Sequence, residues 1–167
     1  QGLLSFANLS GANLSGANLQ GVDLADANLS GIDLRTTTLT DARLTNTRFD
    51  RADLSGQDLH GRNLKGASFA SANLSKANLA DADLTGARLN AANMSSAKLQ
   101  QAQAEGASFS EANLDGANMR SAYLVGADFT RASMKNTDLT FATLRNARWT
   151  DGRKCGVAFS IGSCAWL

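Results

Sequence analysis

The sequence predicts an all-β solenoid with four sides and about 20 residues per coil, a period typical of such repeat architectures. A large apolar residue, here called a centre, recurs at every fifth position from Leu9 to Trp149 without a shift of frame, with Ala104 as the single small residue among them. The inward position two residues before each centre, here called the small slot, holds Ala in most units. A fixed period indicates that each unit packs against its neighbours along the chain.

The five-residue period excludes an amphipathic helix. Five steps of about 100° would carry successive centres around a helix and leave no apolar stripe. A centre and its small slot suit an extended segment, because alternate side chains share one face. A straight strand would send the next pair to the opposite face, so the chain must turn once in every repeat unit. Asp and Asn residues, which often precede the centres, are expected to hydrogen-bond at these corners.

The aromatic centres indicate the number of sides. Successive members of this set are four or eight repeat units apart, namely Phe49, Phe69, Phe109, Phe129 and Trp149. With four sides per coil and coils about 4.8 Å apart, all five rings would lie on one interior wall. The sequence therefore predicts seven to eight coils in a rod roughly 35 Å long.

Units such as "ANLSG", "ADLTG" and "ASFSE" resemble the pentapeptide repeat family, whose motif is A(D/N)LXX. The resemblance covers residues 7 to about 151 in one frame. It implies a right-handed quadrilateral β-helix with the centres and small slots inside. We expect a single domain over residues 1–167, with repeats over about 4–151 and a short non-repeat C-terminal cap over 152–167. The interior departs from the motif at Gln57, Arg62 and Ala104.

Composition limits the possible partners. The chain has no Pro, as expected if every coil needs backbone N–H donors for its neighbours. No apolar run approaches the ~20 residues of a membrane span. The net charge is +1, with 16 basic and 15 acidic residues interspersed, which argues against nucleic acid or an anionic membrane as partner. No cofactor is expected. A calcium-binding β-roll would need a Gly-Asp nonapeptide repeat, which this chain lacks. An ice-binding surface would need the Thr-rich "RTTTLT" to recur at 20-residue spacing, and it does not.

Two cysteines, Cys155 and Cys164, lie beyond the regular repeat. We favour a disulfide between them, which would close a ten-residue loop and stabilise the last coil by roughly 2.5–3 kcal/mol. Two buried free thiols are the alternative. A metal site would lack ligands, because the only histidine, His60, lies far along the chain. Since disulfides persist in oxidising compartments, we expect an extracytoplasmic protein (periplasm, lumen or secreted), and we interpret Gln1 as a processed or trimmed terminus.

Both ends of the solenoid need caps, because a bare end exposes apolar surface and unpaired backbone. We expect Trp149, Phe159 and Trp166 to cover the last coil. We expect residues near the start to cover the first coil, namely Leu3, Leu4 and Phe6. The pairing of two copies through a solenoid end is a further expectation.

Gln57 and Arg62 occupy consecutive small slots. An unpaired buried guanidinium would cost several kcal/mol, so Arg62 should reach solvent or find a partner. We favour a local corner distortion with a bound water over a small polar site shared with His60 and Asp58. One histidine cannot supply a catalytic triad, so no enzymatic activity is expected. Ala104 replaces a large centre and should leave a small void or an inward shift.

The function that these features favour is a non-enzymatic scaffold that binds an unknown protein partner. Outward residues are mostly small or polar, and against them Tyr123, Val125 and Phe141 stand out. We expect these three to form an apolar patch with Arg120 and Arg145 at its rim. The patch would serve as an interaction surface, or the tail would cover it through Ile161 or Trp166.

The alternative function follows from the family resemblance. Some members that confer quinolone resistance mimic DNA and bind DNA gyrase. That mimicry needs a rod of negative charge in the cytoplasm. The balanced charge of this chain and its cysteine pair both disfavour it.

Overall fold

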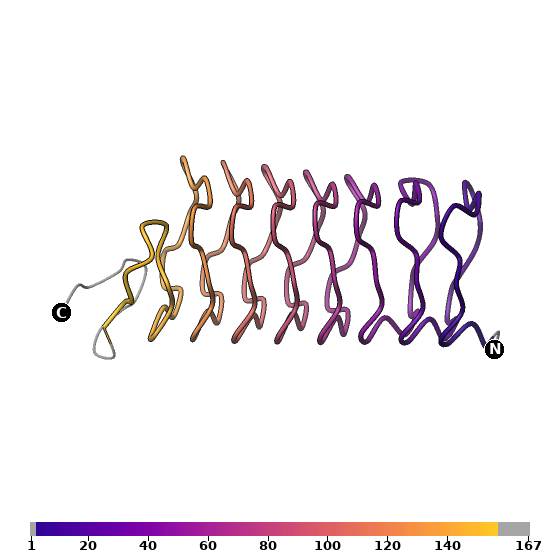
Figure 1. Ribbon diagram of the computed structural model, residues 1–167, viewed down its shortest axis with the longest axis horizontal. Coiled ribbons are helices and arrows are strands. Elements are labelled where there is room, and N and C mark those ends of the chain that lie inside the picture. The colour runs from indigo at the N-terminus through magenta and orange to yellow at the C-terminus, as the bar shows by residue number, and fades with distance from the viewer. Residues whose placement is uncertain (1–2, 157–167) are drawn as a thin grey trace.

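The computed structural model describes residues 3–156, which form an elongated rod of stacked coils (Figure 1). Parallel bridges join residues that occupy the same position in successive coils, four repeat units apart in the sequence. They run from Leu3–Asp23 to Asp128–Arg148. Nearly every side of a coil contributes one bridged residue between two-residue turns, with Asn13 as an exception, so residues 3–156 contain isolated bridges in place of continuous strands and no helix. The predicted four-sided solenoid, with four repeat units per coil, is confirmed.

The corners follow one design. The carbonyl of every centre from Leu9 to Trp149 except Leu29 accepts the N–H of the third residue after it, as Leu9 accepts from Ala12 at 2.9 Å. The residue two positions after the centre has a positive φ of 55–75° throughout residues 6–146 except at Thr36. Asn and Asp before the centres cap these turns, as where Asn93 Oδ1 accepts the Ser95 N–H at 3.2 Å. The expected role of these side chains at the corners is thereby confirmed.

The core is a continuous column of side chains. Every centre from Leu24 to Phe129 is at most 2% exposed. The ring pairs Phe49–Phe69 and Phe109–Phe129 are stacked, with centroids 5.0 and 5.1 Å apart, and Trp149 packs edge-on against Phe129 at 5.9 Å. The single aromatic wall predicted from the sequence is therefore present.

Ala104 shows how a small centre is accommodated. Its side chain is fully buried, and its N–H still donates to the Tyr123 carbonyl at 2.8 Å. A surface hollow of about 290 Å³ lies at this position, lined by Thr85, Gln103, Glu105 and Tyr123. Gln103 and Glu105, the residues on either side of Ala104, both line this hollow. This is expected if the wall moves inward over a small side chain.

The two ends of the described rod are less buried than its middle. Leu9 and Leu14 at the start and Leu139 at the end are only half-buried. The expectation that Leu3 and Phe6 cover the first coil is wrong, because each is 78% exposed. Both occupy outward positions beside Leu4, which alone packs against the core.

The regular repeat ends shortly after the last aromatic centre. Arg148 forms an antiparallel bridge with Lys154. In the preceding corners the positive φ falls two residues after the centre, but after Trp149 it falls three residues later, at Gly152. The expected cap residues Phe159 and Trp166 lie outside the described residues. Within residues 3–156, no helix has the length and apolar character needed to cross a membrane.

Candidate functional site

Two exposed aromatic residues lie near the C-terminal end of the rod, away from the exposed Phe6 at its start. Tyr123 is 56% exposed and Phe141 is 63% exposed, whereas Val125 is half-buried. Tyr123 is bridged to Thr143 in the next coil, two residues after Phe141. Phe141 lies at the turn before this side of the rod and Val125 at the turn after it, with Tyr123 between the two turns, so one continuous patch of all three residues stays a prediction.

Phe141 is held in a conformation that bulky residues rarely adopt. Its φ is +61°, in the left-handed region that costs a non-glycine residue of order 1 kcal/mol. The Arg120 guanidinium lies 5.6 Å from the centroid of the Phe141 ring and 3.6 Å from Asp138 Oδ2. Arg120 thus borders the patch, as expected, and holds the exposed ring in a cation–π contact. Arg145 is exposed nearby.

Gln57 is buried in its small slot, with 9% of its surface exposed. Its amide nitrogen donates to the carbonyls of Leu34, at 2.5 Å, and Thr37, at 3.0 Å. Thr47 uses the same slot two sides earlier to donate to Leu24 at 2.8 Å. The longer Gln57 side chain therefore makes the bond that a threonine makes and takes a second acceptor as well.

That second acceptor belongs to the ladder, meaning the backbone hydrogen bonds between neighbouring coils. In a regular unit such as the one at Arg48, the N–H before the centre donates to the small-slot carbonyl of the preceding coil, here Ala27, at 2.9 Å. At Gln57 the corresponding acceptor is Thr37, which the side-chain amide occupies. Within residues 3–156 the ladder lacks the bridges expected at 13–33, 38–58 and 43–63.

Each missing bridge lies next to an oversized residue in a small slot. These residues are Ile32, Gln57 and Arg62. Slots with Val22 or Thr47 keep their bridges. The slot therefore tolerates the β-branched side chains of Val and Thr, but a longer side chain separates the coils.

Arg62 reaches the surface, as the cost of burying its charge requires. Its side chain is 26% exposed, and its guanidinium bonds Asp41 Oδ1 at 3.0 Å. His60 Nδ1 lies 3.6 Å from Asp81 Oδ2, whereas Asp58, among the described residues, accepts only from the backbone N–H of His60 and the side-chain amide of Asn78. The structure thus pairs the Arg62 and His60 side chains with two different aspartates, while Arg62 Nε donates to the His60 carbonyl at 3.3 Å. The use of these residues as one ligand site stays a prediction.

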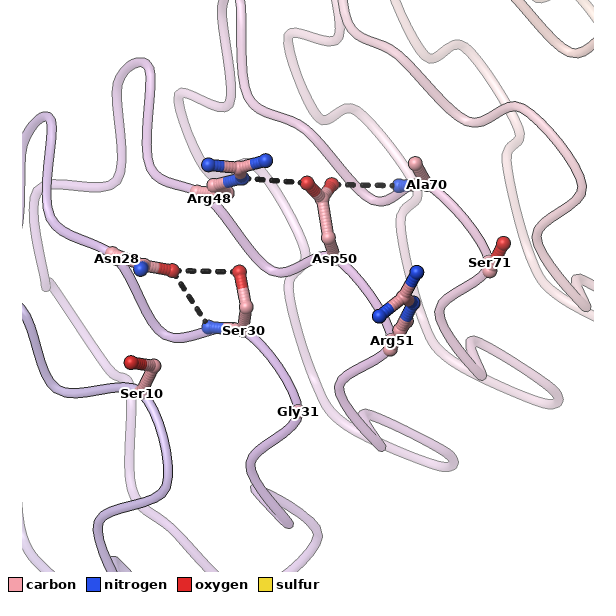
Figure 2. Close-up of a pocket in the computed structure, with 9 residues that line it drawn as sticks. All are labelled: Ser10, Asn28, Ser30, Gly31, Arg48, Asp50, Arg51, Ala70 and Ser71. Atoms are coloured by element: carbon pink, nitrogen blue, oxygen red, sulfur yellow. Dashed lines mark hydrogen bonds and ion pairs between the residues drawn. The ribbon is translucent and has the colours of Figure 1, made fainter.

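The structure adds a groove that the sequence analysis did not identify (Figure 2). It has a volume of about 480 Å³. Its lining comprises Ser10, Asn28, Ser30, Gly31, Arg48, Asp50, Arg51, Ala70 and Ser71. The signal in the sequence is a set of small outward residues that recur one or two coils apart around an arginine pair.

Asp50 is the acidic group of this groove. Arg48 Nε donates to Asp50 Oδ2 at 2.6 Å, and Asp50 Oδ1 accepts the Ala70 N–H at 3.1 Å and the Ser68 hydroxyl. Burial alone would raise the pKa of Asp50, but the hydrogen bonds from Ser68, Arg48 and Ala70 outweigh it and lower this pKa. Asp50 is therefore an ionised acceptor whose bonds are already made.

Cys155 is buried, with 2% of its surface exposed. Cys164 lies outside the described residues, so the disulfide between them stays a prediction. Among residues 3–156, no group of three or more His, Cys, Asp or Glu side chains is placed to hold a metal ion.

Comparisons with known proteins agree with this architecture. The chain matches the family model described as "Pentapeptide repeats" in eight copies, over residues 3–90 and 92–148. Among proteins with curated functions, no sequence match was found.

Two solved structures from cyanobacteria are similar in sequence and fold. HetL from Nostoc sp. strain PCC 7120, a pentapeptide repeat protein involved in heterocyst differentiation regulation, is 31% identical with a TM-score of 0.57, over 91% of this chain and 78% of HetL. Rfr23 from Cyanothece 51142 is 27% identical with a TM-score of 0.50, over 82% of this chain and 90% of Rfr23.

Proposed function

Because the chain belongs to the pentapeptide repeat family and has its right-handed quadrilateral β-helix, we propose that it is a non-catalytic protein-interaction scaffold outside the cytoplasm. The observation that carries the interaction role is the pair of exposed aromatic side chains, Tyr123 and Phe141, near the C-terminal end of the rod. The other large exposed hydrophobic side chains of residues 3–156, Leu3 and Phe6, lie at the opposite end. Exposed aromatic residues beside an arginine are typical of the centres of protein interfaces.

The rod suits this role because its core leaves the outward positions free to vary. Each side presents its own row of side chains at the coil spacing, and the corners tolerate many residue types. The regulatory role stated for HetL is also one that a binding protein can fill. Acidic residues are paired with bases along the rod, as at Asp23–Arg43, Asp83–Lys65 and Glu111–Arg131. For this reason we do not propose a DNA mimic that binds DNA gyrase.

The double variant Tyr123→Ser, Phe141→Ser tests the interaction surface. It removes both exposed rings and leaves the buried centres unchanged, so we expect an unchanged melting temperature. Capture of a partner from the native compartment, or self-association measured by sedimentation, should fall at least about tenfold, as for the loss of interface aromatic residues.

A variant at the other end of the rod, Phe6→Ser, is the matched control. Phe6 is an exposed aromatic residue at the same kind of corner as Phe141, with φ of +60°, and its replacement should leave the interaction intact. Loss of thermal stability in the double variant with no loss of association would show that the patch is covered by the chain's own tail. That result would contradict the proposed interface.

The proposed location depends on the cysteine pair. Protein isolated from its native compartment and then denatured without reductant should give no reaction with a thiol reagent, and two thiols after reduction. The reduced protein should also lose roughly 2.5–3 kcal/mol of stability in its last coil. Two reactive thiols in the unreduced sample would contradict the extracytoplasmic proposal and leave the interaction surface untouched.

A further inference from the structure

We propose that the groove around Arg48 and Arg51 binds an acidic oligosaccharide, with Arg51 as the residue that contacts a sugar carboxylate. This site lies on a different side of the rod from the Tyr123–Phe141 patch and does not depend on it. It would give the scaffold a second ligand of a different chemical class.

The charge of the groove is the first argument. Arg48 and Asp50 neutralise each other through their 2.6 Å ion pair. Arg51 makes no side-chain hydrogen bond or ion pair with any of residues 3–156, and in Figure 2 its guanidinium extends between Asp50 and Ser71. One positive charge therefore remains uncompensated. A guanidinium matches a carboxylate in a two-pronged geometry, and this match gives stronger hydrogen bonds than neutral groups do.

The preorganised arrangement of the groove is the second argument. Asp50 is fixed to the next coil by the Ala70 N–H, and this bond holds Arg48 in place through the ion pair (Figure 2). The two terminal nitrogens of Arg48 make no hydrogen bond with the described residues, so they remain available to a ligand. A positioned donor loses less side-chain entropy on binding than a free arginine does.

The hydroxyl groups indicate a sugar in preference to a simple anion. Ser10 and Ser30 donate their hydroxyl protons to Asn8 and Asn28, at 2.7 and 2.6 Å, so their oxygens can only accept from a ligand. The Ser71 hydroxyl makes no hydrogen bond with the described residues and can donate. A phosphate or sulfate offers few protons to acceptors, whereas the hydroxyls of a sugar both donate and accept.

The period of the rod is the fourth argument. The groove crosses four successive coils, because its lining runs from Ser10 to Ser71. Neighbouring coils are about 4.8 Å apart, a distance close to the length of one linked pyranose ring. Arg88, without an ion pair among residues 3–156, lies two coils beyond Arg48 in the same column. An extended chain of uronic acids that follows this side of the rod would therefore meet the guanidinium groups of Arg48 and Arg88.

Calorimetric titration tests the proposal with trigalacturonate, neutral maltotriose and inorganic phosphate as probes at low ionic strength. Trigalacturonate should bind, with an affinity that falls as salt is added, and maltotriose and phosphate should each bind at least about tenfold more weakly. Arg51→Ala should weaken trigalacturonate binding at least about tenfold, and Ala70→Leu should weaken it by filling the groove.

Two control variants share the local structure of the tested positions. Arg131 occupies the same corner position as Arg51 on the same side, with φ of +62° against +60°, but it is paired with Glu111. Ala80 occupies the same turn position as Ala70 on another side. Arg131→Ala and Ala80→Leu should therefore bind trigalacturonate as the unmodified protein does. Equal weakening by Arg51→Ala and Arg131→Ala, phosphate binding as tight as that of trigalacturonate, or no trigalacturonate binding would each overturn the proposal.

Discussion

Replacing Gln57 with threonine is expected to raise the free energy of unfolding by about 1–2 kcal/mol, the net value of one or two restored ladder bonds. A threonine in this slot can keep the bond to the Leu34 carbonyl. Thr37, Thr47 and Thr137 donate in the same way, each at 2.8 Å, to the preceding-coil carbonyls of Leu14, Leu24 and Leu114. It cannot reach the Thr37 carbonyl, which then becomes free to accept the Asp58 N–H. The smaller entropy loss of a shorter buried side chain adds to the gain.

Hydrogen exchange measures this change residue by residue. The Leu39 and Asp58 amides, which lack their ladder partners, should exchange more slowly in Gln57→Thr, while amides in the regular coils should not change. Urea denaturation of the same samples gives the stability difference. A lower stability in Gln57→Thr would show that the buried amide supports the coils that it separates.

The reverse substitution at Thr47 is the matched control. Thr47 lies in a slot whose ladder is intact, because the Arg48 N–H donates to Ala27 at 2.9 Å. Thr47→Gln should open that ladder, accelerate exchange at the Arg48 amide and lower the stability by about 1–2 kcal/mol. If Thr47→Gln leaves exchange unchanged, the size of the slot does not cause the separation at Gln57.

The fold could be predicted because a five-residue period leaves one arrangement in which every centre points inward. The ring wall followed from the same arithmetic, since Phe109 and Phe129 are four repeat units apart. The opening of the ladder could not be predicted in this way. It depends on the width of a slot that accepts Val22 but not Ile32, and a repeat pattern does not contain that dimension.

The candidate sites were predictable to different degrees. Tyr123 and Phe141 are conspicuous because each is a large residue at an outward position of its unit. The groove is inconspicuous because its serines and glycine are ordinary residues at the corners of such a rod. It exists only where successive coils bring Ser30, Arg51 and Ser71 together on one side, so side chains from different coils had to be considered together.

Replacing Phe109 with alanine is expected to lower the free energy of unfolding by about 3–5 kcal/mol. Phe109 is fully buried, and its ring stacks on Phe129 with an interplanar angle of 5°. Removing it leaves a cavity inside a wall whose ladder bonds resist collapse, and it also ends the ring contact. Urea denaturation followed by circular dichroism measures the loss.

Phe109→Leu is the conservative control for this substitution. The same wall already contains Leu89, one coil before Phe109 and 0% exposed, so a leucine fits the column and should cost no more than about 1.5 kcal/mol. Because a coil packs only on its neighbours, exchange of amides near Phe129 should rise more than exchange near Phe49. A loss below about 1 kcal/mol in Phe109→Ala, or equal losses for both variants, would mean that the coils move together to fill the space. The stacked rings would then contribute little to the stability of the rod.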